Sequence, residues 1–297
     1  MSASMSLGQR LWSSWKRLWL GQADARRLAL YRLAWGLAAL IIAATDGPRA
    51  GDYAPNRFHV PLSSLAAPIW PETHEILRYV ALGGALLALT GVLARVGIAA
   101  ATAVYAYLLS VDLLMFRNHV YLLCLLGLIL ACSPCDRRLS LLRRAPDSES
   151  ELAPRWPEQL IKAQILTVYA WAVVAKLNPS FLAGVVLSSD LAATLPDSPL
   201  GALLQGPLIG LYPLVLGGLG HAGAMAALSW FVLLSEAALL VGLCIPRLRR
   251  AAVIVGLVLH AGIALAMNVF AFALLMVGSY VFFWPRSAAV ARKTRTA

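Results

Sequence analysis

The sequence is poor in charged residues, since Asp, Glu, Lys and Arg together make up only 13% of its 297 residues. Soluble domains carry about 25% charged and 45–50% apolar residues, whereas 60% of this chain is hydrophobic. A single core of this size cannot hide so large an apolar surplus, because much of any folded domain stays at the surface. An ordinary soluble protein is therefore excluded, and the apolar surface must face lipid.

Cysteines are few, and the familiar catalytic and nucleotide-binding motifs are missing. The four cysteines all fall in or next to apolar runs, so no disulfide framework is indicated. The sequence has no GxxxxGK[ST] loop, no GxGxxG turn after a strand, no HExxH and no GxSxG. The net charge of +11 comes from arginines grouped between apolar runs, which is typical of membrane topology signals. Nothing in the sequence indicates a nucleic-acid partner.

Long apolar segments are what the sequence does have, and they predict an all-α, polytopic membrane helix bundle. About 20 helical residues cross a bilayer. On this basis we predict eight transmembrane helices, at 27–45, 76–94, 96–116, 119–134, 160–177, 222–245, 250–268 and 270–285. The apolar segment 198–219 is interrupted by prolines and glycines, so we expect a re-entrant or interfacial element there, with a ninth helix as the alternative. Residues 1–26 carry tryptophans and basic residues that predict an amphipathic helix lying on the membrane.

The distribution of basic residues predicts the orientation. With a cytoplasmic N-terminus and eight crossings, only 5 of the 25 Lys and Arg fall on the external side, which leaves 20 on the cytoplasmic side. We therefore expect a protein of the inner cell membrane with both termini in the cytoplasm. The prediction divides the chain into the interfacial segment 1–26, one transmembrane domain at 27–285 and a basic cytoplasmic tail at 286–297.

Several polar residues fall at membrane depth, where ionisable groups are costly and mark sites or structural pairs. Most gather toward the external ends of predicted helices, which is the pattern of a site. The candidates are Asp112, Arg117, Asn118, His119, Tyr169, Lys176, Asn178, Glu236 and His260. Each also has a structural interpretation. His119 could be an interfacial cap, Lys176 could extend to lipid headgroups, and Glu236 and His260 could bond between helices.

Cys132-Ser-Pro-Cys135 has the spacing of a thiol redox site or of half a zinc site. No second CxxC and no nearby histidine accompany it, so no metal is expected. The motif falls at the predicted cytoplasmic end of the fourth helix, where thiols stay reduced. A thiol–quinone redox protein built on Cys132 and Cys135 remains an alternative function.

The motifs, taken in order, resemble a known family. The segment Arg117-Asn118-His119-Val120-Tyr121-Leu122 is similar to the Asn-His-x-Tyr-Leu element of vitamin K-dependent gamma-carboxylases and of their bacterial relatives, the HTTM (horizontally transferred transmembrane) domain proteins. The run from Gln164 through Tyr169 and Lys176-Leu177-Asn178 to Gly184 resembles the Gln…Val-Tyr…Lys-Leu-(Asp/Asn)…Gly segment of the same family. His260 corresponds to a histidine in a late helix, and the resemblance covers about residues 27–285.

This resemblance implies a quinol-dependent carboxylase-like enzyme with its site at the external face. Lys176 falls on the family's catalytic base, and Asn118 and His119 on its active-site pair. The implied co-substrates are a reduced quinone similar to vitamin K hydroquinone, O2 and CO2. Burial suits the role of Lys176, because a dry pocket disfavours the ammonium form and leaves an amine that can accept a proton. The implied partners are membrane lipid and a small peptide or protein substrate.

The family pattern also differs from the sequence at specific places. Ala175 stands where the animal carboxylase has a first lysine, Arg117 replaces a polar neutral residue, and we expect the 297 residues to hold no counterpart of the animal enzyme's large extramembrane domain. A second hypothesis is therefore a non-catalytic membrane helper that matures, exports or binds a partner peptide.

The catalytic hypothesis requires Lys176 and His119 to line one cavity and Lys176 to be mostly buried. We also expect Glu236 to bond to a neighbouring helix, with His260 as a candidate partner.

Overall fold

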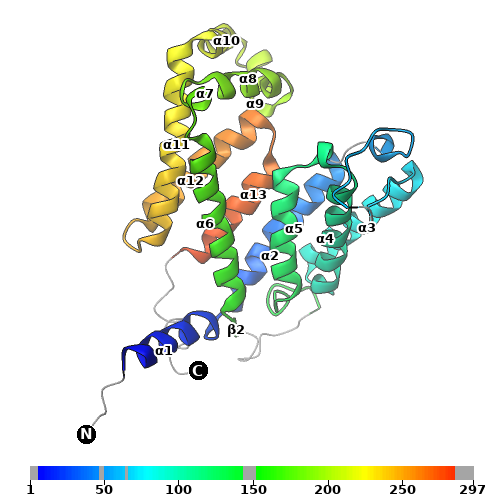
Figure 1. Cartoon of the computed structure of the whole chain (residues 1–297), viewed down its shortest axis with the longest axis vertical. Helices are drawn as coiled ribbons and strands as arrows, with labels where there is room; N and C mark the ends of the chain where they lie inside the picture. Colours follow the sequence, from blue (N-terminus) through cyan, green and yellow to red (C-terminus); the bar gives the residue numbers. More distant parts are fainter. Residues whose placement is uncertain (1–5, 47–49, 64–65, 143–151, 285–297) are drawn as a thin grey trace. The chain divides into compact units, whose positions relative to one another are not determined.

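The computed structural model describes residues 6–46, 50–63, 66–142 and 152–284, and nearly all of this is helical (Figure 1). The predicted tail 286–297 lies outside the described residues. The longer helices are α1 (Leu7–Trp19), α2 (Ala25–Ile41), α3 (Pro71–Thr90), α4 (Ala94–Val111), α5 (Asn118–Ala131), α6 (Trp156–Lys176), α11 (Ala222–Cys244), α12 (Arg249–Met267) and α13 (Phe270–Ser279). Four shorter helices separate α6 from α11, namely α7 (Pro179–Leu182), α8 (Val185–Thr194), α9 (Pro199–Gln205) and α10 (Tyr212–Gly220). Two strands, β1 (Gln22–Asp24) and β2 (Leu152–Pro154), pair antiparallel with Ala23 opposite Ala153.

A helix occupies each of the eight segments predicted to cross the membrane, and the all-α polytopic prediction is confirmed. Among the described residues, four helical stretches are long and apolar enough to span a bilayer, and these are Ala25–Thr45, Ala94–Val111, Ala222–Cys244 and Arg249–Met267. The stretch predicted to be re-entrant or interfacial holds α9 and α10, and the two halves bend by 97° at the break between them. The number of eight crossings stays a prediction.

The helix α1 forms where an interfacial helix was predicted. Ser6 caps it by accepting a hydrogen bond from the backbone N–H of Gln9, whose side chain bonds back to Ser6 N–H. None of its residues is buried, the rings of Trp12 and Trp15 stack at 5.1 Å, and the Lys16 ammonium lies 5.2 Å from the Trp12 ring. Aromatic rings beside cations are the composition that favours a membrane interface.

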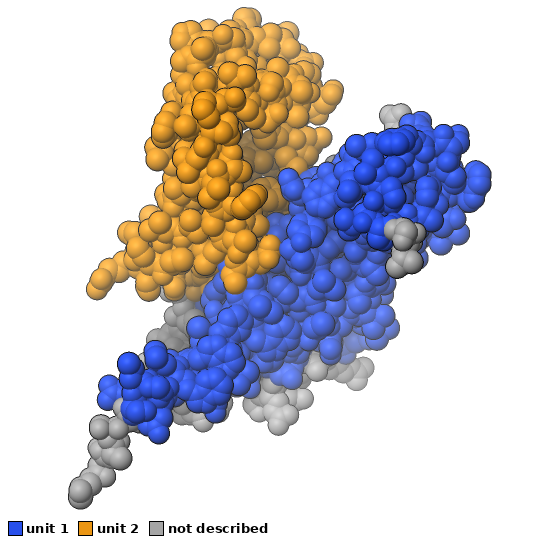
Figure 2. Space-filling model, in the orientation of Figure 1, with its two compact units in different colours: residues 1–162, 286–297 blue, residues 163–285 orange. Residues whose placement is uncertain are grey.

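The chain divides into two compact units, which Figure 2 shows in different colours. In the first unit, up to Lys162, the core is formed by α2, α3, α4 and α5. Small residues let α3 and α4 approach closely, since a Cβ on Gly97 would lie 2.8 Å from the Gly84 carbonyl oxygen. Close helix contact through glycine and alanine is the usual packing mode inside a bilayer, where lipid offers no hydrophobic drive for association.

A fully buried arginine fixes one end of the first unit. Arg32 of α2 is 0% exposed, and its guanidinium donates hydrogen bonds to the carbonyl oxygens of Cys135, Arg138 and Leu139 at 3.0, 3.3 and 2.5 Å. These carbonyls belong to the turn that follows α5, which Arg32 thus ties to α2. The Cys-Ser-Pro-Cys segment is therefore part of a hydrogen-bonded structural turn. Cys132 is exposed, Cys135 is buried, and burial raises the pKa of the Cys135 thiol to about 11.

The second unit, from Ala163, contains most of α6, the short helices α7 to α10, and α11 to α13. The short helices lie together beyond the end of α6, beside the first half of α11 (Figure 1). Their approach to α11 depends on Gly184, which has a φ of 82° and whose Cβ would collide with the backbone of Met225. A residue with a side chain would be strained by the positive φ and would clash with Met225, so this position requires glycine. This packing places the start of α11 and the end of α12 around an apolar interior.

Candidate functional site

The polar centre of the second unit is an ion pair between α6 and α11. The Lys176 ammonium nitrogen lies 2.9 Å from both carboxylate oxygens of Glu236 and donates its hydrogen bond to Oε1. The Lys176 side chain is 25% exposed and the Glu236 side chain 9%, so both are mostly out of solvent. The Oε2 atom is buried and accepts no hydrogen bond among the described residues. Since buried polar atoms are nearly always satisfied in folded proteins, this oxygen is a place where a ligand hydroxyl could donate.

The end of α6 positions Lys176. Asn178 breaks the helix, because it has an extended backbone and its side-chain oxygen caps α7 by accepting from the Phe181 N–H. The Phe181 ring then lies 5.7 Å from the Lys176 ammonium, within the range of a cation–π contact. The last turn of a helix also favours a cation, because unpaired carbonyls point there. Asn178, predicted as a pocket residue, therefore acts here as a cap.

A second polar cluster lies in the core of the same unit. The Tyr169 hydroxyl is 2.9 Å from His260 Nε2 and 2.7 Å from the Tyr280 hydroxyl. His260 is 2% exposed, and its Nδ1 has no hydrogen-bond partner among the described residues. The ring of Phe272 meets His260 edge-on at 5.6 Å between centroids. The three hydroxyl and imidazole groups form a continuous hydrogen-bonded chain across α6, α12 and the turn after α13.

The second unit also holds an apolar cavity of about 510 Å³ among the short helices α8 to α10 and parts of α11 and α12. Its walls include Val232, one helical turn from Glu236, and Leu259, the neighbour of His260. The remaining wall residues are Leu187, Leu191, Leu195, Leu200, Val215, Gly218, Leu219, Met225, Leu228, Phe231, Val258, Gly262, Ile263, Ala266 and Met267. Cavities of this size hold drug-sized ligands, and a wall without charged groups selects an apolar one.

Asp112 belongs to a polar corner of the first unit. It was predicted within a helix reaching 116, and that prediction is wrong, because α4 ends at Val111. The carboxylate accepts from the backbone N–H groups of Leu114 and Val60, at 2.9 and 3.2 Å, and lies 3.3 Å from His59 Nδ1. Burial alone would raise the pKa of Asp112, but these donors outweigh burial and hold the pKa below its usual value. Asp112 thus ends α4 and starts the Leu113–Met115 turn.

Arg117, Asn118 and His119 also lie in the first unit, at the start of α5. Asn118 is exposed, whereas Arg117 and His119 are half-buried. The catalytic hypothesis places Lys176 beside them, but Lys176 belongs to the second unit. A shared cavity of Lys176 and His119 therefore stays a prediction.

Two of the pairings in the second unit were not foreseen. Glu236 bonds to a neighbouring helix as predicted, but its partner is Lys176 and not His260, which pairs with Tyr169. Tyr280 and Phe181 were not among the candidates. Tyr280 was detectable in principle, since it is a hydroxyl-bearing residue within an otherwise apolar segment. Phe181 carried no such signal. In the described part of the chain, no three His, Cys, Asp or Glu side chains are grouped as a metal site would require.

Among the described residues, a mainly helical chain with long apolar helices and a mostly buried Lys–Glu pair defines a polytopic integral membrane protein. The comparisons with known proteins make the class specific, because the HTTM domain matches residues 21–287. The chain belongs to the HTTM domain family. No curated protein and no solved structure matches it significantly.

Proposed function

We propose that this HTTM protein is a quinol-dependent, carboxylase-like membrane enzyme in which Lys176 is the base. The observation that carries the proposal is the Lys176–Glu236 pair, in which Glu236 lies one helical turn from Val232 of the cavity wall. A lysine with a carboxylate 2.9 Å away can pass its proton to that carboxylate, which leaves a neutral amine and a neutral acid. The Glu236 side chain is only 9% exposed, so the carboxylate that receives the proton is shielded from water.

The described residues fit a reduced quinone. Besides its 2.9 Å contact with the Lys176 ammonium, the Oε2 of Glu236 has no hydrogen-bond partner among the described residues, so it can accept the hydrogen bond of a ring hydroxyl. The cavity whose wall includes Val232, one turn away, can hold an isoprenoid side chain. When bound, a reduced quinone supplies the electrons with which O2 is activated, and CO2 is the group added to the substrate. The work of this chain is to bind the ring hydroxyl, remove its proton and exclude water.

The proton path is short. The Lys176 amine accepts the proton of a hydroxyl within hydrogen-bond reach, about 2.6–3.2 Å. Glu236 already holds the proton that Lys176 gave up and stays a neutral acid, and the Phe181 ring stabilises the ammonium as it forms. The His260–Tyr169–Tyr280 chain supplies polar groups in the same unit that can orient a ligand without adding charge. We further propose an inner-membrane location with both termini cytoplasmic, as the basic residues predict.

The test is turnover by the purified chain in lipid nanodiscs. Reduced menaquinone or phylloquinone, O2 and labelled bicarbonate are added with a glutamate-containing peptide, and both CO2 incorporation and quinone epoxide are measured. Lys176→Ala is expected to abolish both products, whereas the control Lys162→Ala, which changes another lysine of α6, keeps them. Lys162 pairs with Glu158 at 2.5 Å and lies four turns from the site. Absence of turnover by the native chain with any reduced quinone would favour the non-catalytic helper.

A further inference from the structure

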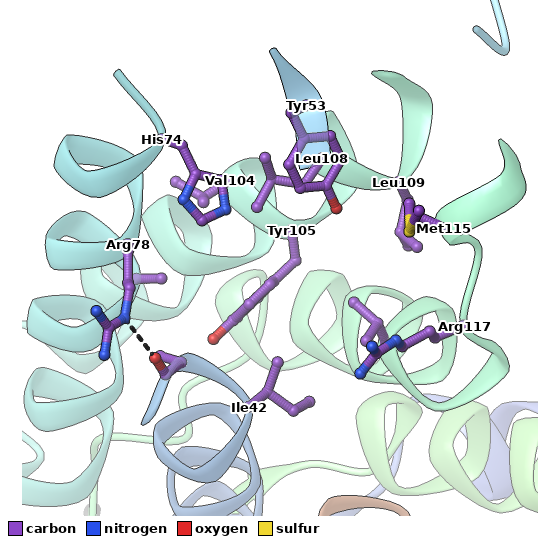
Figure 3. Close-up of a pocket in the computed structure, with 13 residues that line it drawn as sticks. Ile42, Tyr53, His74, Arg78, Val104, Tyr105, Leu108, Leu109, Met115 and Arg117 are labelled. Atoms are coloured by element: carbon purple, nitrogen blue, oxygen red, sulfur yellow. Dashed lines mark hydrogen bonds between the residues drawn. The ribbon is translucent and has the colours of Figure 1, made fainter. Parts of the chain in front are cut away.

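The first unit contains a small cavity of about 50 Å³ where α3, α4 and α5 meet the Ala50–Tyr53 turn. Figure 3 shows its lining, with His74 and Arg78 on one side, Arg117 on the other and Tyr53 above. A cavity needs roughly 10–15 Å³ by this measure for each water molecule. The space thus admits one small group of a few heavy atoms, and no part of the quinol site proposed above belongs to it.

Positive charge dominates the lining. Two arginines face the space, and none of the described residues that line it is acidic. Arg78 uses Nε to bond the Ala43 carbonyl oxygen at 2.8 Å and Nη1 to contact Glu75 at 3.3 Å, which leaves its Nη2 free to donate. The Glu75 contact is between half-exposed side chains, and such contacts neutralise little charge.

A buried histidine nitrogen completes this side of the cavity. His74 is 4% exposed, and its Nδ1 has no hydrogen-bond partner among the described residues. Burial lowers the pKa of His74 and outweighs the opposing charge of Glu75, and the charge of Arg78 acts in the same direction as burial, so the ring is neutral at pH 7 and carries one N–H. Because a buried polar atom without a partner is costly, a ligand oxygen that accepts this N–H would relieve the cost.

The Tyr53 hydroxyl provides another donor. Burial raises the pKa of Tyr53 to about 12, although the charge of Arg117 acts in the opposite direction. The phenol therefore keeps its proton at pH 7. The effect of Arg117 also indicates that its guanidinium lies near the Tyr53 ring. His74 stacks on the other side of that ring, at 5.4 Å between centroids.

We propose that this cavity binds a phosphate oxyanion, with Arg78 and Arg117 holding it from opposite sides and His74 and Tyr53 donating to its remaining oxygens. Guanidinium groups bind phosphate through paired, charge-assisted hydrogen bonds. Four donors arranged around one space suit a tetrahedral group with oxygens on every side. A carboxylate, whose two oxygens point the same way, would leave part of the set unused.

The source that we favour is the headgroup of an anionic phospholipid. The rest of the lining is aliphatic, and the residues beside Met115 of the cavity wall are apolar and exposed, with Leu114 63% and Phe116 42% accessible. A lipid can place its phosphate in the cavity and its acyl chains along this surface. Free phosphate offers the same oxyanion without chains, so the two sources are separable by experiment.

The experiment uses the full chain, purified and delipidated in detergent, and native mass spectrometry with four probes. These are dioleoyl phosphatidylglycerol, dioleoylglycerol, inorganic phosphate and acetate. The variants are Arg117→Gln and Arg78→Lys, the second of which keeps the charge and the fold but loses the paired donors. The control is Arg57→Gln, which removes an external arginine that is 62% exposed and does not line the cavity.

We expect each cavity variant to weaken phosphatidylglycerol binding at least tenfold, and the control to change it less than twofold. Dioleoylglycerol should bind more weakly than phosphatidylglycerol and show no dependence on either arginine. Binding of inorganic phosphate as tight as that of the lipid, with the same dependence, supports the oxyanion site and assigns it to free phosphate. Equal binding of phosphatidylglycerol by all variants, or acetate binding that exceeds phosphate binding, overturns the proposal.

Discussion

The Lys176–Glu236 pair makes a quantitative prediction about the stability of the second unit, because its two members differ in exposure. Lys176→Met leaves the Glu236 carboxylate, 9% exposed, without its cation. Removing one partner of a buried pair lowers the unfolding free energy by about 3–5 kcal/mol. Because this pair is partly exposed, we expect a loss at the lower end, about 3 kcal/mol. Glu236→Leu instead leaves Lys176, which is 25% exposed and lies at a helix end, where its long stem can carry the ammonium toward water. We therefore expect this variant to lose only about 1 kcal/mol of unfolding free energy.

The double variant tests whether the two effects have one origin. With both charges gone, the pocket is apolar throughout, and such replacements are often neutral in soluble proteins. The free energies of unfolding, measured by steric trapping in bicelles, should therefore show a coupling of about 4 kcal/mol between the two positions. A control cycle between Lys162→Met and Glu236→Leu should show none. A Lys176–Glu236 coupling below about 0.5 kcal/mol, the level of ordinary intramembrane hydrogen bonds, would refute the reasoning.

Four further predictions follow from single features. Tyr169→Phe removes the hydroxyl between His260 and Tyr280 and should cost about 1–2 kcal/mol of unfolding free energy, whereas Tyr79→Phe, at an exposed ring, should cost nothing measurable. Gly84→Val should disrupt the α3–α4 contact and lower the melting temperature, while the adjacent Gly83→Val meets open space and should not; equal effects would contradict the packing argument. The pKa of Asp112 lies below its usual value, so the stability that its carboxylate contributes is present at neutral pH and is lost as the pH falls below about 4, the usual carboxyl pKa. Asp112→Asn removes this contribution, so the free energy of unfolding of the variant should depend less on pH on the acid side. In a cysteine-free background, a reagent added from outside should label Ser180→Cys and not Ser14→Cys, and the reverse pattern would invert the predicted topology.

Much of the fold was accessible from the sequence because the signal is local. The lengths of the apolar runs locate the helices, and the charged residues between the runs mark where the helices end. The errors occur where a single side chain competes with the helix. Asp112 lies in an apolar run that reads as continuous, yet its carboxylate captures the Leu114 N–H and ends α4. The hydrophobic periodicity of the sequence carries no signal of this competition.

Pairings between helices were not accessible in the same way. Lys176 and Glu236 lie 60 positions apart, and which turn of α11 faces the end of α6 depends on how the short helices pack against Met225. His260 had two chemically reasonable partners, Glu236 and Tyr169, and only the rotation of α12 decides between them. Residue types therefore identified the members of the polar clusters, but the three-dimensional packing determined which member bonds to which.

The buried guanidinium of Arg32 has a consequence for genetic screens. Its three carbonyl partners hold the turn after α5, so a substitution there leaves several polar groups unsatisfied in the interior at once. A search for inactive alleles should therefore recover Arg32 as readily as Lys176, although Arg32 donates only to main-chain oxygens. The two classes differ in abundance, since Arg32 alleles should be degraded while Lys176 alleles accumulate in the membrane. Immunoblots of membrane fractions would thus separate residues required for the protein to exist from residues required for it to act.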